Sequence, residues 1–201
     1  MKIERKYKIC RRLKSSIFEK CQTTAFTKSE QRIKNKKTDK RPKAPSEYGL
    51  QLIEKQKVRF GYGITERQLS NYIQESLSKK GSIQDHLYEL LENRLDNIVY
   101  RLGLAHTRRL ARQMVSHGHF KINGVRTTVP SYQVKINDVV TVRDGSRTSP
   151  LFTNIVEKAK QYKVPAWLSL KPEAYEATVL GKPKNTEGFL NLSSVFEFYS
   201  R

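Results

Sequence analysis

The stretch "HTRRLARQMVSHGHFKINGV", residues 106–125, combines an amphipathic helix pattern with a turn signal. A threonine can cap the helix, and apolar residues follow it at three- and four-residue spacing. At about 100° per residue, Arg109 and Arg112 point away from the apolar stripe, and Arg108 lies at its rim. Asn123-Gly124 is the residue pair of a type I′ hairpin turn. The stretch therefore predicts a helix with an arginine face that leads into a β-hairpin.

The sequence on either side continues with helix and strand patterns. Between residues 83 and 102, apolar residues recur at helical spacing, which predicts one long helix or two helices that meet near Glu92. After the hairpin turn, three short apolar runs predict strands. They lie at 125–129, 134–136 and 139–142. Residues 92–145 therefore predict a module of two helices followed by a small antiparallel sheet.

The remaining chain divides into three segments, and the fold class as a whole is predicted to be α+β. Residues 1–43 predict a basic N-terminal arm that is disordered alone. Residues 44–91 predict a helical domain, and residues 146–201 predict a C-terminal segment that packs on the two domains before it. The terminal "NLSSVFEFYSR" is apolar for a chain end, so we expect it to be docked rather than frayed.

Several local signals refine this division. Ser46 and Thr65 are plausible N-caps of two helices, and Gly81 can end the second. The apolar stripe of the second helix consists of Leu69, Tyr72, Ile73 and Leu77. In the C-terminal segment, residues 149–162 predict a helix with proline at its first position, and residues 175–180 predict a strand.

Positive charge is concentrated in parts of the chain. Lys and Arg number 39 against 19 Asp and Glu, for a formal charge of +20. Residues 1–43 carry 16 basic and 4 acidic residues and residues 92–145 carry 9 and 4, whereas residues 44–91 carry 6 of each. Such an excess attracts a polyanion, and nucleic acid is the usual one. We therefore expect the arm to become ordered on RNA.

The arginine helix is the first candidate for RNA contact. An arginine face can also be an ordinary solvated surface, but no acidic residue lies between His106 and Lys121 to neutralise it. Guanidinium groups suit phosphate oxygens, and a helix pair on a small sheet can sit on the backbone and wide minor groove of A-form RNA. In the module, the candidates are Arg94, Arg101, Arg108, Arg109, Arg112, Gln113, Ser116, His117, His119, Lys121, Asn123 and Arg126. In the arm, they are Arg5, Lys8, Arg11, Arg12, Lys36, Lys37 and Arg41.

Two long segments of the module carry a resemblance. "LENRLDNIVYRLGLAHTRRLARQMVSHGHFKINGVR" with "PSYQVKINDVVTV" resembles the RNA-binding module shared by small ribosomal subunit protein four, some pseudouridine synthases and bacterial tyrosyl-tRNA synthetases. The flanking "YGLQLIEKQKVRFGYGITERQL", "VPAWL" and "FEFYSR" resemble the small ribosomal subunit protein four family, bacterial type. The resemblance covers about residues 44–201.

The resemblance implies a structural constituent of the small ribosomal subunit rather than an enzyme. It implies direct binding to small-subunit ribosomal RNA, a role in nucleating assembly of the subunit body, and an influence on decoding accuracy. It implies contacts with small-subunit proteins three and five, and with messenger RNA where that strand enters the subunit. The location it implies is the cytoplasm, bound to the ribosome.

Two other functions remain open from the residues. An RNA-modifying enzyme of the pseudouridine synthase type could use the same module, but residues 146–201 are too few for its catalytic domain. A free RNA-binding regulator could use it as well. No uncharged run approaches the roughly 20 apolar residues of a membrane span, so no membrane partner is expected.

Metal and cofactor signals are weak. Many members of the resembled family carry a four-cysteine zinc site near the N-terminus, but this chain has only Cys10 and Cys21, and a structural zinc needs four ligands. We expect the zinc-free branch of the family, with both thiols reduced and at least partly buried. His117 and His119 have no third ligand nearby in the sequence. We therefore predict no metal and no cofactor.

Overall fold

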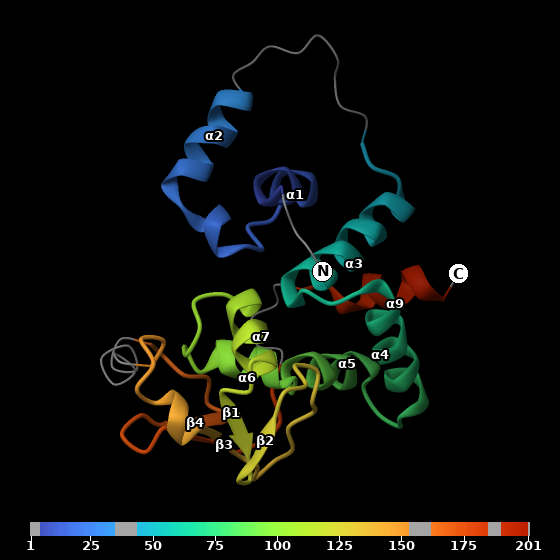
Figure 1. Cartoon of the computed structure of the whole chain (residues 1–201). Coiled ribbons are helices and arrows are strands. Elements are labelled where there is room, and N and C mark those ends of the chain that lie inside the picture. The colour runs from blue at the N-terminus through green and yellow to red at the C-terminus, as the bar shows by residue number, and fades with distance from the viewer. Residues whose placement is uncertain (1–4, 35–43, 153–161, 185–189, 201) are drawn as a thin grey trace. The chain divides into compact units, whose positions relative to one another are not determined.

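The computed structural model describes residues 5–34, 44–152, 162–184 and 190–200. The chain forms two compact units (Figure 1). We call residues 1–79 with 187–201 the helical unit, and residues 80–186 the sheet unit. Each unit is described by itself below.

Two helices at the centre of the helical unit, α3 and α4, begin at residues whose side chains cap them. Ser46 Oγ accepts a hydrogen bond from Gly49 N at the start of α3 (Glu47–Tyr62), and Thr65 Oγ1 accepts one from Gln68 N at the start of α4 (Glu66–Ser78). Gly63 ends α3 with φ 65°, a left-handed conformation that favours glycine. The predicted caps at Ser46 and Thr65 are confirmed, whereas α4 ends at Ser78, before Gly81.

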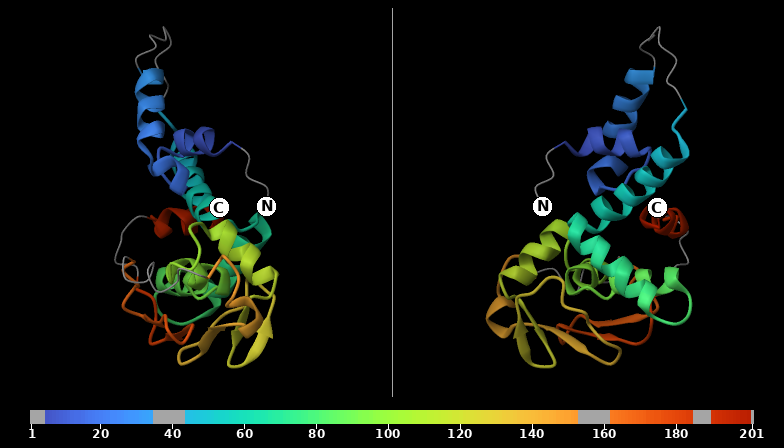
Figure 2. Two further views of the ribbon diagram at one scale, coloured as in Figure 1. Left: turned by 60° about the vertical axis from the view of Figure 1, so that its left-hand side comes forward. Right: turned by 90° about the vertical axis from the view of Figure 1, so that its right-hand side faces the viewer.

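The chain end is docked, as expected. The last helix, α9 (Leu192–Tyr199), packs along α3, as Figures 1 and 2 show, and buries Leu192 and Val195. Of the stripe predicted for α4, Leu69, Tyr72 and Ile73 are buried. Leu77 is 57% exposed, so its place in the core was wrongly predicted.

The N-terminal arm has structure of its own. Residues 5–34 form α1 (Lys6–Leu13), the 3₁₀ helix η1 (Glu19–Gln22) and α2 (Thr24–Lys34). They bury a small core of Cys10, Phe18, Cys21 and Phe26, with Phe60 of α3 packed against it. The expectation of an arm without its own fold is therefore wrong for residues 5–34. A few aromatic and thiol side chains supply the core that the high charge appeared to rule out.

Two helices, rather than one, occupy residues 83–101 of the sheet unit. They are α5 (Ile83–Glu92) and α6 (Leu95–Arg101), and the backbone leaves helical geometry at Arg94, with φ −65° and ψ 135°. Leu95 N then donates to Tyr132 O, and Val134 N donates to Asn93 O. The break therefore lets a later loop satisfy backbone groups between the two helices.

A five-stranded antiparallel sheet completes this unit. Its order is β2-β1-β3-β5-β4, with every neighbouring pair antiparallel. The strands are β1 (Phe120–Ile122), β2 (Val125–Thr127), β3 (Val139–Val142), β4 (Leu168–Lys171) and β5 (Glu176–Val179). Asn123 and Gly124, with φ 49° and 83°, form the predicted β1–β2 turn.

The structure differs in detail from two sequence predictions for the strands of this unit. Residues 134–136 do not form a strand; a single bridge joins Gln133 to Arg94 instead. β4 and β5 extend the small sheet predicted for residues 92–145, and β5 confirms the strand expected within residues 175–180. The helix predicted for residues 149–162 lies mostly outside the described residues.

The core of the sheet unit lies between its helices and one face of the sheet. Ile98 and Val99 of α6 and Ala111, Met114 and Val115 of α7 (Arg108–Ser116) pack against alternate strand residues. The strand residues are Phe120, Ile122, Val140, Val142, Leu168, Ala177 and Val179. This packing fixes α7 on the sheet and turns its opposite face outward.

Candidate nucleic-acid interface

The outward face of α7 has the predicted composition. Thr107 Oγ1 caps the helix by accepting from Leu110 N at 3.1 Å. With one side buried in the core, the helix leaves Arg109, Gln113 and Ser116 exposed. Arg108 is partly buried at the rim, as predicted. The helix therefore presents cationic and polar donors along one face.

Arg101 and Arg108 are both connected to a buried carboxylate. Arg101 Nε and Nη2 donate to the two oxygens of Glu92 at 2.9 and 2.8 Å, and Glu92 is fully buried. Asn97 Nδ2 donates to Glu92 Oε2 at 2.9 Å, and Arg108 Nε donates to Asn97 Oδ1 at 2.8 Å. The guanidinium of Arg108 also lies 4.4 Å from the ring centroid of Tyr100. These contacts join α6 and α7 through polar groups.

Arg94 and Arg112 share a second buried carboxylate, Asp96. Arg94 Nε and Nη2 donate to the two oxygens of Asp96 at 3.0 and 2.7 Å, and Arg112 Nε lies 3.8 Å from Asp96 Oδ2. The Arg94 side chain is fully buried, so its predicted role as an RNA contact is wrong. It holds the break between α5 and α6 instead. About a third of the Arg112 side chain is exposed.

The acidic partners were missed because they lie on another element. The sequence shows no acid on the arginine helix itself, but Asp96 of the preceding helix approaches Arg112 in space, and Glu92 pairs with Arg101. A carboxylate in an apolar helix stripe is a sequence signal for such pairing, because a charge is rarely buried without a partner. Glu92 and Asp96 both lie within the stripe of residues 83–102.

Two histidines follow α7 at its C-terminal end. Their rings stack with centroids 6.1 Å apart, and His119 Nδ1 lies 2.9 Å from Ser146 Oγ. Burial and the positive charges of neighbouring side chains hold the pKa of His119 below its usual 6.5. The guanidinium of Arg126 packs against Gly118, whose φ is 74°, and donates to His117 O at 3.3 Å. Arg126 and the two histidines, all predicted RNA contacts, are thus brought together.

Two other predicted contacts serve the hairpin. The Asn123 side chain donates to Asp138 Oδ1 and accepts from Val139 N, so its amide stabilises the turn. Lys121 Nζ lies 2.8 Å from Asp144 Oδ2. Lys121 therefore contributes less positive charge to this surface than the sequence suggested.

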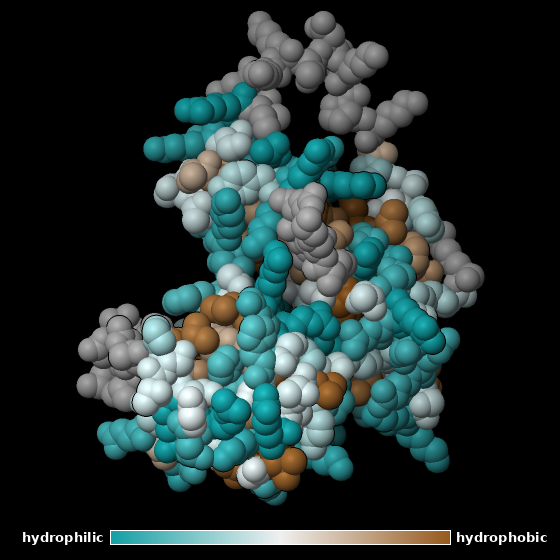
Figure 3. Space-filling view, viewed as in Figure 1, coloured by the Kyte–Doolittle hydropathy of each residue, from teal (hydrophilic) through white to brown (hydrophobic). Residues whose placement is uncertain are grey.

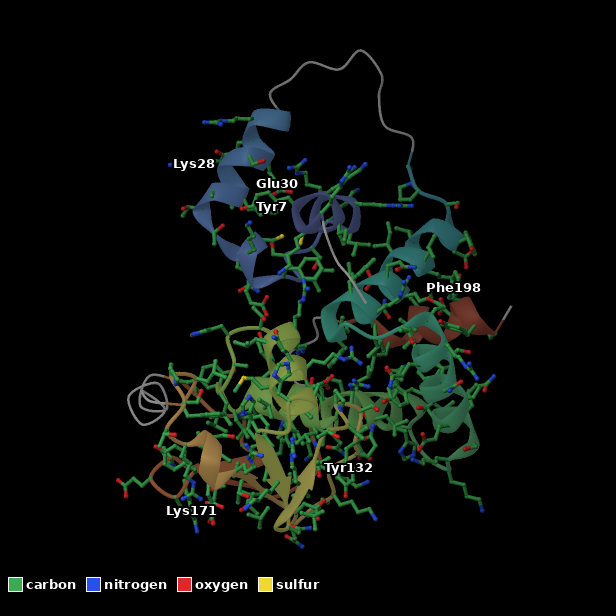
Figure 4. The ribbon with its side chains drawn as sticks, in the orientation of Figure 1. Tyr7, Lys28, Glu30, Tyr132, Lys171 and Phe198 are labelled. Atoms are coloured by element: carbon green, nitrogen blue, oxygen red, sulfur yellow. The ribbon has the colours of Figure 1, made fainter. Side chains whose placement is uncertain are left out.

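A second basic surface belongs to the helical unit. An open groove of about 590 Å³ is lined by five cations, Arg5, Lys6, Lys8, Arg11 and Lys20, and by Tyr7. Tyr7, labelled in Figure 4, packs against Phe26 at 5.2 Å between ring centroids. Of the predicted arm contacts, Arg5, Lys8 and Arg12 are exposed and Arg11 is partly exposed. Lys36, Lys37 and Arg41 lie outside the described residues.

Metal-ligating side chains do not cluster in the described ranges. No group of three or more His, Cys, Asp or Glu residues is placed to hold an ion there. Cys10 and Cys21 are free buried thiols.

No described helix is long and apolar enough to cross a membrane. Hydrophilic side chains cover most of the face seen in Figure 3.

These features define a class of protein. Two separate basic surfaces, one on a helix backed by a small sheet and one in a groove along α1, are suited to a polyanion with regularly spaced phosphates. The fold and the surfaces are those of an RNA-binding protein.

Comparison with known proteins gives the particular family. Residues 93–140 match the S4 domain, and residues 2–92 match the ribosomal protein S4/S9 N-terminal domain. Small ribosomal subunit protein uS4 of Syntrophomonas wolfei is 46% identical over 163 residues, which cover 80% of this chain and 78% of the relative. The uS4 protein of Chloroflexus aurantiacus is 40% identical over 188 residues, which cover 88% and 91%. The chain belongs to the uS4 family of ribosomal proteins.

The family match also corrects the extent of the resemblance. It begins at residue 2, whereas the sequence motifs placed its start at about residue 44. The N-terminal helices are therefore part of the family domain rather than an appended tail. Their low periodicity and high charge concealed this in the sequence.

Proposed function

We propose that this chain is a structural protein of the small ribosomal subunit that binds small-subunit ribosomal RNA through two surfaces. The first is the outward face of α7 with Arg108, Arg109 and Arg112. The second is the basic groove along α1. The observation that carries the proposal is the cationic face of α7. The opposite side of this helix is packed in the core against the sheet, so the arginine side faces outward. The helix lies in the S4 domain of a chain that belongs to a ribosomal protein family.

The proposed mode of binding is contact with phosphates rather than reading of base edges. The major groove of A-form RNA is too narrow for a helix, but its backbone and wide minor groove are accessible. Arg109 is exposed for such contact, and Gln113 and Ser116 add neutral donors on the same face. Binding of this kind weakens steeply with salt, because each neutralised phosphate releases counterions.

The finer parts of the proposal concern assembly and decoding. We infer that the chain nucleates the body of the subunit and contacts proteins three and five and the incoming messenger RNA. An element that influences decoding must loosen without unfolding the protein. The polar contacts that hold α9 to α3 and α4 support this role, because such contacts can be broken at modest cost.

A structural role is favoured over an enzymatic one. Among the described residues, the two buried carboxylates are Glu92 and Asp96, and both are bound by arginine side chains. A buried acid held in this way stabilises the fold and is a poor nucleophile. The comparisons match ribosomal proteins along most of the chain.

Two measurements test the proposed function. Hydroxyl-radical footprinting of the full chain on small-subunit ribosomal RNA should show defined protected sites at moderate salt. Sedimentation of the native protein should place it with small subunits. A protein that sediments free of subunits would favour the regulator, and protection without defined sites would contradict specific ribosomal binding.

A further inference from the structure

We propose that Asn97 is a positioning residue for RNA binding, which acts by holding the guanidinium of Arg108. The inference rests on the proposed function of the α7 face. Asn97 is only 1% exposed, so it does not itself reach RNA. Its effect would pass through Arg108, whose Nε donates a hydrogen bond to Asn97 Oδ1.

The hydrogen bonds of Asn97 fix which end of its amide faces Arg108. Nδ2 donates to Glu92 O at 3.1 Å and to Glu92 Oε2 at 2.9 Å. Both partners are acceptors, so the nitrogen must point to Glu92 and the oxygen to Arg108. A flipped amide would place donor against donor on one side and acceptor against acceptors on the other. The orientation is therefore determined by chemistry.

Glu92 is in turn held in place from its other side. Both of its carboxylate oxygens accept from Arg101, in a bidentate pair that has little freedom to rotate. The order of contacts is Arg101, Glu92, Asn97 and Arg108. A fully buried carboxylate thus anchors an uncharged amide, and the amide anchors the arginine at the rim.

Arg108 is held at its edge and at its face. Asn97 Oδ1 binds Nε, and the Tyr100 ring lies under the guanidinium at 4.4 Å. A long arginine side chain otherwise samples many rotamers and loses that freedom when it binds a phosphate. Because Asn97 and Tyr100 restrict it beforehand, less entropy is lost on binding RNA.

Asparagine suits this position better than its relatives. Aspartate would keep the acceptor for Arg108 but would place a second negative charge beside buried Glu92. Alanine would remove the acceptor, so Arg108 Nε would lose its hydrogen bond to position 97.

A double-mutant cycle on the full chain tests the proposal. We would measure binding to a small-subunit ribosomal RNA fragment for the wild type, Asn97→Ala, Arg108→Ala and the double variant. Arg108→Ala should weaken binding about tenfold. Asn97→Ala should weaken it about threefold in the wild type and not further in the Arg108→Ala background. Arg109, exposed on the same helix, is the control: Asn97→Ala combined with Arg109→Ala should be additive.

The outcomes separate this inference from the proposed function. Equal losses from Asn97→Ala with and without Arg108 would show a merely structural role and overturn the inference alone. No loss from Arg108→Ala would contradict the α7 interface itself and this inference with it. If Asn97→Ala does not fold, Asn97→Ser, which adds no charge beside Glu92, takes its place in the same cycle. Equal losses from Asn97→Ser with and without Arg108 would again overturn the inference.

Discussion

The hydroxyl of Tyr199, in the last helix, donates a hydrogen bond of 2.6 Å to Glu66 Oε1 at the start of α4. Lys55 Nζ of α3 donates to the same oxygen at 2.7 Å and lies 4.3 Å from the ring centroid of Phe198, which Figure 4 labels. Gln51 of α3 also donates to Glu197. One carboxylate thus connects two consecutive helices, α3 and α4, to the last helix of the chain.

Removing the Tyr199 hydroxyl should weaken this connection. Tyr199→Phe loses a hydrogen bond to a charged group that is partly exposed to solvent, so we expect a loss of about 1 kcal/mol in unfolding free energy. Urea unfolding of the full chain measures the change. Ser200→Ala, at an exposed neighbour, should change stability by less than about 0.5 kcal/mol. Equal effects of the two variants would contradict the account.

The proposed function also predicts that weaker packing of α9 affects decoding. Tyr199→Ala removes the hydroxyl and most of the ring that packs on Phe198 at 5.4 Å between centroids. A strain that carries it should read through stop codons more often than the wild type, at a protein level sufficient for assembly. A reporter gene with an internal stop codon measures this. Normal assembly with wild-type readthrough would show that these aromatics act only as core.

Acid should weaken the same contact. Burial would raise the pKa of Glu66, but hydrogen bonds from Lys55 and Tyr199 outweigh it and hold the pKa below the usual 4.5. Stability from this group is therefore present above about pH 4.5 and is lost as pH falls through the lower folded-state value. Unfolding in urea between pH 6 and 3 should show a smaller acid loss in Tyr199→Phe. An identical pH profile would contradict this assignment.

The two thiols should be unreactive in the folded protein. Burial, together with the hydrogen bond to Cys10, raises the pKa of Cys21 to about 12, so little thiolate forms at neutral pH. We expect iodoacetamide to alkylate Cys10 and Cys21 only as fast as the N-terminal helices open, and at once in urea. Rapid alkylation without denaturant would contradict the buried core.

Metal analysis should find no zinc, and one equivalent would overturn our interpretation of these cysteines.

The features that the sequence predicted are those that local chemistry determines. Ser46, Thr65 and Thr107 cap helices because a side-chain oxygen next to an apolar stripe can accept a backbone N–H, and Asn123-Gly124 suits its turn because both residues tolerate positive φ. These preferences act over a few residues, so a short window of sequence shows them.

The features that it missed depend on residues brought together by folding. Arg94 looks like a surface cation in the sequence. In the structure it lies where the helix is interrupted between α5 and α6, and its buried side chain pairs with Asp96. The core around Cys10 and Phe26 joins α1, η1 and α2 without a regular apolar period. Neither the partner of a charge nor an irregular core can be derived from spacing alone.

The salt dependence of RNA binding tests the central claim most directly. The full chain and a variant with Arg108, Arg109 and Arg112 changed to Ala would be titrated with a small-subunit ribosomal RNA fragment over a range of salt concentrations. A variant with Arg67, Lys79 and Lys80 changed to Ala removes the same three charges from exposed positions elsewhere and is the matched control. Each lost phosphate contact should lower the slope of log K against log salt by about one unit, so the α7 variant should lose two to three units and the control much less. An α7 variant with the wild-type slope, or a control that loses as much, would contradict the assignment of α7 as the RNA-binding face.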